Sequence, residues 1–280
     1  MTAKRYRPQL SDAARPATYE VEAYDERGEK VPSAVAGEHP LTLYLDKREL
    51  VTLMTLGHAP EALAIGYLRN QRLVRSIGEI LAVQVDWETE SVAITTQSKR
   101  RIDKKVKQRT VTTGCGQGTV FGDLMEEVDR IRLRDDVTLA DVDLFVLLEK
   151  VRKHETIYKQ AGAVHGCALA TRSGDILMFV EDVGRHNAVD AIAGFMWLDA
   201  IDGSDKVFYT TGRLTSEMVI KCAQMGIPFL VSRSGLTKMG HEVARKVGLT
   251  MLGRASGRHY LVFTGRQRIV RAAVRPAAIA

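Results

Sequence analysis

Cysteine is scarce in this chain: the three that occur, Cys115, Cys167 and Cys222, are too few for a disulfide framework and lack the paired spacing of a zinc site. No apolar run approaches the roughly 20 residues needed to span a bilayer. The N-terminal residues also lack the apolar core of a signal peptide. We therefore expect a cytoplasmic protein with no membrane segment and no bound metal, in which each thiol is either inert or a working nucleophile.

Several nucleotide and metal signatures are absent as well. The chain has no Walker A motif, and no G-x-G-x-x-G motif between a strand and a helix. A zinc deaminase would need H-x-E and P-C-x-x-C, but no acid stands two residues after His165, and Met225 occupies the position three residues after Cys222. Aromatic residues make up only 6% of the chain and do not interleave with its basic run, which argues against nucleic-acid binding.

What is present is the composition of a soluble globular protein, with 280 residues, 45% of them hydrophobic, and a formal net charge of +6. The positive charge favours anionic partners. Hydrophobic periodicity predicts a helix at 59–70 among strands at 19–24, 41–45, 80–85 and 91–96, and then a regular alternation. In that second half we expect strands at 164–171, 176–181, 207–211, 229–232, 249–252 and 260–264, with helices at 138–158, 187–198, 216–225 and 241–247.

This pattern predicts an α/β fold with two unequal parts. We expect a flexible arm at residues 1–18 and a small α+β domain at 19–109. A mobile connector at 110–134 then leads to a larger α/β domain at 135–280. The basic run and the glycines that follow it mark the junction between the two domains.

Cys115 is the sharpest candidate for chemistry. It lies in the run GCGQG at 114–118, whose glycines predict an exposed, flexible loop. Seven lysines and arginines stand between positions 99 and 109, against the single acid Asp103. Because nearby cations favour the thiolate, and the thiolate is the nucleophile, this setting favours a reactive Cys115.

The remaining positions limit what such a thiol could do. Gly118 stands where a C-x-x-C motif would have its second cysteine, so dithiol redox cycling is not expected. A lone thiolate suits a covalent carrier, since no neighbouring thiol would discharge its cargo. Cys167 and Cys222 fall within apolar strand or helix patterns, and we interpret them as inert core residues.

A second group of polar residues, EDVGRHNAVD at 181–190, follows a predicted strand and opens a predicted helix. Ligand sites concentrate at this edge of α/β sheets. Its six polar or charged residues exceed what helix capping requires, which favours a ligand role for Arg185 and His186. The alternative is that Asn187 is an N-cap with solvated neighbours. His165, on the preceding strand, is either a ligand or a satisfied core histidine.

Three loops at predicted strand ends combine arginine with small residues. They hold Gly212 with Arg213, Ser232 with Arg233, and the run Arg254, Ala255, Ser256, Gly257, Arg258 and His259. Backbone N–H groups and guanidinium forks of this kind bind phosphate oxygens. Each loop is a weak signal, but three at corresponding strand ends predict a site for an anionic, nucleotide-like ligand.

Taken together, these motifs resemble the FdhD family of formate dehydrogenase accessory sulfurtransferases. The resemblance runs from about residue 39 to residue 265. Its most specific blocks are the Cys115 loop, GAVH at 162–165, the run 181–190, TGR at 211–213, SEM at 216–218, GIP at 226–228 and VSRS at 231–234.

The resemblance implies a homodimer with a three-layer, cytidine-deaminase-like C-terminal domain. It implies that sulfur passes from a cysteine desulfurase to the molybdenum cofactor, Mo-bis(molybdopterin guanine dinucleotide), before this client enters formate dehydrogenase. Cys115 matches the family's persulfide-bearing cysteine. The loop 254–259 falls where the family binds the guanine nucleotide part, so a GDP-like nucleotide is expected to mimic the cofactor.

One departure from the family pattern matters. Many members carry C-x-x-C, whereas this chain has C-x-x-G, so Cys115 would have to act without the second cysteine. A non-catalytic chaperone that binds the cofactor, with Cys115 incidental, is the alternative, because the C-terminal half fits it equally well.

Overall fold

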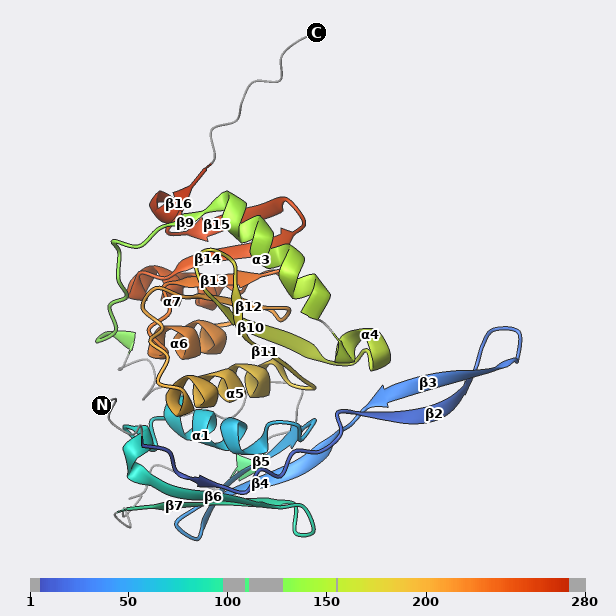
Figure 1. Ribbon diagram of the computed structural model, residues 1–280. Helices are drawn as coiled ribbons and strands as arrows, with labels where there is room; N and C mark the ends of the chain where they lie inside the picture. Colours follow the sequence, from blue (N-terminus) through green and yellow to red (C-terminus); the bar gives the residue numbers. More distant parts are fainter. Residues whose placement is uncertain (1–5, 98–108, 111–127, 155, 272–280) are drawn as a thin grey trace, which may run out of the picture.

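The computed structural model describes residues 6–97, 109–110, 128–154 and 156–271. They form a mixed α/β structure in which two six-stranded sheets lie on either side of a pair of packed helices (Figure 1). Most of the buried apolar side chains belong to one continuous core that crosses from the first sheet, through the two helices, to the second sheet.

The N-terminal sheet has the strand order β1-β6-β7-β4-β5-β8. Its strands are β1 (Gln9–Leu10), β4 (His39–Leu45), β5 (Arg48–Thr55), β6 (Ile80–Asp86), β7 (Ser91–Thr96) and β8 (Arg109–Thr110), with a 3-10 turn η1 (Ile77–Glu79) before β6. Alternate residues of β4, namely Leu41, Leu43 and Leu45, are buried. Helix α1 (Pro60–Asn70) packs on the sheet and begins with a proline, which lacks the N–H that a first helical residue leaves unused.

A hairpin outside this sheet was only half predicted. Strands β2 (Thr18–Tyr24) and β3 (Lys30–Ala36) pair only with each other and project from the body of the molecule (Figure 1). The pattern at 19–24 identified β2, but Pro32 and the small residues of β3 concealed the second strand.

The C-terminal sheet has the order β11-β10-β12-β13-β14-β15. Its strands are β10 (His165–Ala170), β11 (Ile176–Asp182), β12 (Val207–Thr210), β13 (Phe229–Ser232), β14 (Thr250–Ser256) and β15 (His259–Thr264). The central strands β12, β13 and β14 are parallel, while β10, β11 and β15 run antiparallel to their neighbours. Parallel pairing brings the carboxyl ends of β12, β13 and β14 to one edge of the sheet.

Helices cover both faces of this sheet. Helix α3 (Asp141–His154) buries Leu144, Leu147, Leu148 and Val151 against one face. Helices α5 (Arg185–Leu198), α6 (Ser216–Gln224) and α7 (Lys238–Val247) pack in the core on the other face. The remaining elements are α4 (Ile157–Ala161), η2 (Arg266–Arg268) and the short pair β9 (Leu139–Ala140) and β16 (Ile269–Val270).

The two sheets are joined by the crossing of α1 over α5. A Cβ on Gly66 would lie 1.6 Å from the carbonyl oxygen of Asp190, and one on Gly194 would lie 1.9 Å from that of Ala62. Only glycine permits backbones to approach so closely, so the pair Gly66 and Gly194 sets the separation of the two halves.

Two expectations differ from the structure. The segment expected as a flexible arm is fastened where it is described: β1 pairs with β6, the Tyr6 hydroxyl donates to the Ile80 carbonyl, and the Ala13 N–H donates to Glu61. These contacts are long-range, so the polar composition of the segment gave no sign of them. The helix expected at 138–158 is shorter, because α3 ends at His154 and α4 is a separate turn.

Candidate functional site

The strand-end edge of the C-terminal sheet brings together residues from distant parts of the chain. Strands β12 and β13 end side by side, and β10 begins beside them because it runs antiparallel to β12. His165 opens β10, and its Nδ1 lies 3.3 Å from the Thr211 hydroxyl oxygen. The Ser232 hydroxyl donates to the Gly212 carbonyl over 2.7 Å. The structure thus places His165, Gly212 and Ser232 on one edge, as the loop pattern predicts.

Three arginines lie around His165. Burial is the main cause that lowers the pKa of His165 below 6.5, and the positive charges of Arg185, Arg233 and Arg213 lower it further, in that order. The imidazole is therefore neutral at pH 7. Arg213 and Arg233 are exposed, and Arg185 is half-buried. We call His165 and these three arginines the cation cluster; its field attracts an anion.

Local contacts restrict two of the arginines of this cluster, Arg185 and Arg233. A Cβ on Gly212 would lie 2.6 Å from Cδ of Arg185, so glycine at this position leaves room for the arginine stem. The Arg233 guanidinium lies over the ring of Tyr158, with 5.3 Å between its carbon and the ring centroid. Both contacts restrict the guanidinium groups before any ligand arrives, which lowers the entropic cost of binding.

Asp182 holds the turn that carries Arg185. Its buried carboxylate accepts a hydrogen bond from the Thr55 hydroxyl at 2.6 Å, and others from the N–H groups of Leu56 and Gly184 at 3.3 and 3.1 Å. Burial raises the pKa of Asp182 to about 6, although these hydrogen bonds favour the charged form. The end of β5 in the N-terminal sheet therefore helps to position the start of α5.

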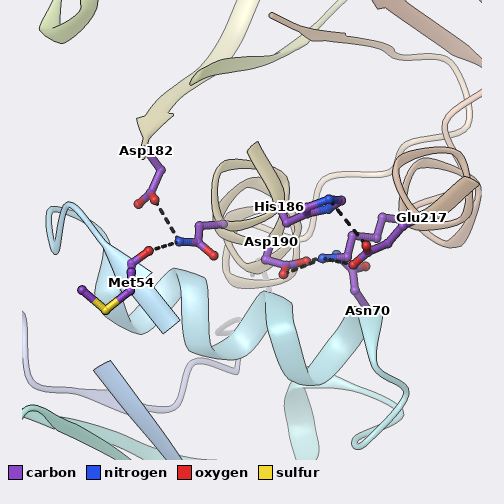
Figure 2. Close-up of polar contacts among 8 residues, drawn as sticks. Met54, Asn70, Asp182, His186, Asp190 and Glu217 are labelled. Atoms are coloured by element: carbon purple, nitrogen blue, oxygen red, sulfur yellow. Dashed lines mark hydrogen bonds and ion pairs between the residues drawn. The ribbon is translucent and has the colours of Figure 1, made fainter. Parts of the chain in front are cut away.

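Asn187 contributes to the same junction and is not the helix cap that the sequence suggested. Helix α5 begins two residues earlier, at Arg185, with Gly184 at the N-cap. The Asn187 side-chain amide donates to the Met54 carbonyl at 2.6 Å and to Asp182 at 2.9 Å (Figure 2). The reason is tertiary: the N-terminal sheet supplies acceptors that no local pattern reveals.

A buried group of charges lies one turn further along α5. The Lys221 ammonium lies 2.8 Å from Asp190 and 3.6 Å from Glu217, and the Asn70 amide donates to Asp190 at 2.7 Å. The His186 imidazole lies 3.5 Å from Glu217 (Figure 2). Burial, followed by the charge of Lys221, lowers the pKa of His186 to about 2, so this histidine is neutral. We call these five residues the buried charge network, and His186 is a member of it.

The two ends of the segment 254–259 lie against different parts of the molecule. The Arg254 N–H donates to the Ser234 carbonyl at 2.9 Å, which holds the start of the loop beside the end of β13. Ser256, Gly257 and Arg258 instead line a groove of about 790 Å³ against α3. Ala255 is buried and His259 opens β15. Since α3 and α5 cover opposite faces of the sheet, this groove and the cation cluster are neighbouring rather than identical sites.

The two cysteines that the structure describes are both buried, as the sequence predicts. Cys167 is buried, its thiol donates to the Thr210 hydroxyl oxygen at 3.3 Å, and burial raises its pKa to about 12. Cys222 is also buried, and burial raises the pKa of its thiol. The prediction that these two cysteines lie in the core is confirmed, and their raised pKa values disfavour the thiolate. Cys115 and its loop lie outside the described residues, as do the lysines upstream of it.

The described part of the chain also bears on metal binding and membrane insertion. Across residues 6–97, 109–110, 128–154 and 156–271, no three His, Cys, Asp or Glu side chains gather as metal ligands would. None of the helices in these same ranges has the length and apolarity needed to cross a membrane.

Sequence reasoning did not foresee the roles of several residues that shape the site. Glu181 accepts hydrogen bonds from the N–H groups of Ile157 and Tyr158 at 2.9 and 3.0 Å, and so anchors α4 beneath Arg233. Lys221 and Asn70 reach Asp190 from elements 31 and 120 residues away. A lysine and a glutamate at i, i+4 on a helix normally indicate a solvated pair, so no local signal marked Lys221 as buried.

Comparison with known proteins supplies a family. The model of the FdhD/NarQ family matches residues 36–270. A sulfur carrier protein FdhD of Listeria innocua is 29% identical over 244 residues, covering 86% of this chain and 93% of its own. The protein of the same name from Wolinella succinogenes is 30% identical over 236 residues, covering 84% and 82%. The crystal structure of a protein assigned as a formate dehydrogenase accessory protein, from Desulfotalea psychrophila, is similar with a TM-score of 0.72 and 26% identity, covering 90% and 98%.

Proposed function

This chain belongs to the FdhD/NarQ family, and we propose on that basis that it is a sulfur carrier that serves the maturation of a formate dehydrogenase in the cytoplasm. The observation that supports an anionic client is the cation cluster, in which the positive charges of three arginines act on a neutral His165 at the strand-end edge. The names of the relatives, sulfur carrier protein FdhD, support the cargo. The glycines around Cys115 and the cations upstream of it support a reactive thiolate that can carry sulfur.

The proposed transfer begins with the Cys115 thiolate. It attacks the outer sulfur of a persulfide on a cysteine desulfurase, the sulfur–sulfur bond of the donor breaks, and the desulfurase cysteine leaves as a thiolate. The product is a persulfide on Cys115. In the second step the Cys115–sulfur bond breaks with its electron pair returning to the cysteine, and the acceptor supplies the two electrons that convert the sulfur atom to sulfide.

The proposed acceptor is the molybdenum of Mo-bis(molybdopterin guanine dinucleotide), bound as a client before its insertion. Arg185, Arg213 and Arg233 would hold its phosphate oxygens through charge-assisted hydrogen bonds. The groove lined by Ser256, Gly257 and Arg258 would take the guanine nucleoside, and the three arginines would take the phosphates that it carries, so GDP should bind across both sites as a mimic. We further propose that the C-terminal α/β region is cytidine-deaminase-like and that the protein acts as a homodimer.

A non-catalytic chaperone remains the rival function, because a cation cluster binds an anionic cofactor without needing a thiol. Intact-mass spectrometry after incubation with a cysteine desulfurase and cysteine separates the two, with Cys115→Ser as the control. The sulfur carrier gains the mass of one sulfur atom, and the control does not. If the wild-type protein gained no sulfur while it still bound GDP, the carrier proposal would be wrong and the chaperone would stand.

A further inference from the structure

A small cavity lies at the edge of the C-terminal sheet opposite the cation cluster. The parallel strands β12, β13 and β14 begin at this edge and end at the other. The cavity has a volume of about 220 Å³ and is lined by the end of α7, the two residues before β14, the end of β15 and η2. Sites for ordinary small molecules measure roughly 300–1,000 Å³, so this one suits a group of the size of an ion rather than a nucleotide.

Arg268, which lines this cavity, is a buried cation without a counter-charge in contact. Only 4% of the residue is exposed. Among the residues that the structure describes, no carboxylate forms an ion pair with its guanidinium. Burial lowers the pKa of Arg268, and the more distant charges of Asp135 and Asp136 offset this effect only in part. Because an unpaired buried charge is costly, an anion in the cavity would stabilise this arginine.

A structural role accounts for only part of what Arg268 can donate. Its Nη2 donates to the Gly248 carbonyl at 2.8 Å, which caps the C-terminal end of α7, and its Nη1 donates to the Thr250 hydroxyl oxygen at 3.4 Å. A guanidinium carries five N–H groups. The buried Nε of Arg268 has no acceptor among the described residues. The helix cap therefore leaves hydrogen-bonding capacity and a full positive charge beside the cavity.

The remaining polar groups around the cavity are also of the kind that binds anions. Arg245 comes from the last turn of α7 and Gln267 from η2, and both are exposed. None of the described residues that line the cavity is Asp or Glu. The stretch 264–271 carries three arginines and no acid. Two guanidinium groups and a side-chain amide, with no carboxylate among them, create a positive field that attracts an oxyanion.

We propose that this cavity binds a small tetrahedral oxyanion of the phosphate class, held by Arg245, Arg268 and the side-chain amide of Gln267. The anion gives Arg268 its counter-charge, and Arg245 closes the site from the solvent side. Since η2 leads directly into β16, whose Ile269 pairs with Leu139 just before α3, the anion also fastens the C-terminal strand to the body of the protein. The site goes beyond the proposed function, because it lies at the other edge of the sheet and takes no part in sulfur transfer.

The test is a titration of the full-length protein with sodium phosphate, followed by the NMR signals of the Gly248 and Gly265 amides, which line the cavity. Sodium chloride at equal ionic strength controls for screening. We expect saturable shifts for the wild type, and a dissociation constant raised about tenfold or more for Arg245→Ala, which loses a charge-assisted hydrogen bond. Arg213→Ala is the matched control: it removes an exposed arginine of the cation cluster and should leave the dissociation constant at these two amides unchanged.

A second measurement uses stability, because a ligand that binds only the folded state raises the melting temperature. Phosphate should raise the melting temperature of the wild type more than that of Arg245→Ala, whose exposed side chain is not needed for folding. Phenyl phosphate distinguishes the sources of the anion: equal affinity would assign the site to a phosphate group on a larger molecule, and binding of phosphate alone would assign it to the free ion. Wild-type amides that do not saturate, or an Arg245→Ala variant that binds phosphate as tightly as the wild type, would overturn the proposal.

Discussion

Arg185 and His186 are neighbours at the start of α5, yet they belong to regions that use charge in opposite ways. Arg185 joins the cation cluster, where like charges gather at the surface around a neutral histidine. His186 joins the buried charge network, where Lys221 and Asp190 neutralise one another with 2% and 0% of their side chains exposed. Gathering like charges is tolerable only near water, and burying a charge is tolerable only beside its opposite.

The comparison separates binding from stability. The cation cluster should contribute little to folding, since its guanidinium groups repel one another and are partly hydrated. The buried charge network, which links α1, α5 and α6, should contribute nothing directly to ligand binding. Variants of the two regions should therefore move different measurements.

The largest effect is expected for Lys221→Met. It leaves Asp190 buried without its counter-charge, which should lower the free energy of unfolding by about 4 kcal/mol. Urea unfolding followed by circular dichroism measures this. Lys150→Ala, which breaks the exposed pair with Asp175, should cost less than about 1 kcal/mol. Adding Asp190→Leu to Lys221→Met should recover part of the loss, and equal stability of Lys221→Met and the wild type would contradict the role of the network.

The second-largest effect is expected for Gly66→Ala, which should lower the free energy of unfolding by about 3 kcal/mol. The added Cβ would lie 1.6 Å from the Asp190 carbonyl oxygen and would force α1 and α5 apart. Thermal unfolding measures the loss. Gly78→Ala is the matched control, since the nearest atom to its Cβ, the Ser76 hydroxyl oxygen, lies 3.7 Å away. Equal melting temperatures for the two variants would show that the crossing relaxes easily.

The pH dependence of stability should identify His186. Its pKa is about 2 in the folded protein and 6.5 in the unfolded chain. Between these values only the unfolded state binds the proton, so stability falls as pH falls below 6.5, by up to about 1.4 kcal/mol per pH unit. Urea unfolding of His186→Gln should show a shallower loss between pH 6.5 and 5.5 than the wild type; identical slopes would mean that His186 titrates normally.

Arg213→Ala tests the cation cluster. Loss of one exposed guanidinium should weaken GDP binding about tenfold, which corresponds to roughly 1.4 kcal/mol, while stability changes by less than about 0.5 kcal/mol. Isothermal titration calorimetry measures the affinity. Lys238→Ala removes an exposed lysine from the start of α7 and should leave binding unchanged. If Arg213→Ala and Lys238→Ala bound GDP with equal affinity, the attraction would come from the net charge of the protein rather than from the cation cluster.

The smallest effect concerns His165. Burial and, after it, three positive charges lower the pKa of His165, and a bound anion would offset those charges and raise it. Binding should then take up a proton, so GDP affinity should increase a few-fold, on the order of threefold, between pH 7.5 and 6. His165→Gln should flatten this dependence. If the GDP affinity of His165→Gln still increased between pH 7.5 and 6, a group other than His165 would take up the proton.

Much of the fold could be predicted from hydrophobic periodicity. The strand expected at 91–96 is β7, and the helix expected at 59–70 is α1 within one residue. The prediction missed β3, which buries no residue and so needs no apolar pattern, and it also missed β5, although Leu50, Val51 and Leu53 of that strand are buried. It also missed that residues 6–17 are fastened, since hydrogen bonds such as that from Ala13 to Glu61 leave no local signature.

The candidate site was foreseen in part. Arginine beside small residues at strand ends located Arg213, Arg233 and their neighbours, since parallel strands bring such ends together. The same reasoning grouped His186 and the 254–259 loop with them. His186 is instead buried beside Glu217, and Ser256, Gly257 and Arg258 line the groove against α3.

The sequence alone determined which residues are apolar, where the chain turns, and which thiol stands among cations and glycines, because these properties are local. Tertiary structure decided which charges are buried and which are open to ligands, since that depends on what lies opposite. Asp190 is held by Lys221 and Asn70 only because Gly66 and Gly194 let two helices touch. Burial is a property of packing, so adjacent residues such as Arg185 and His186 can acquire opposite roles.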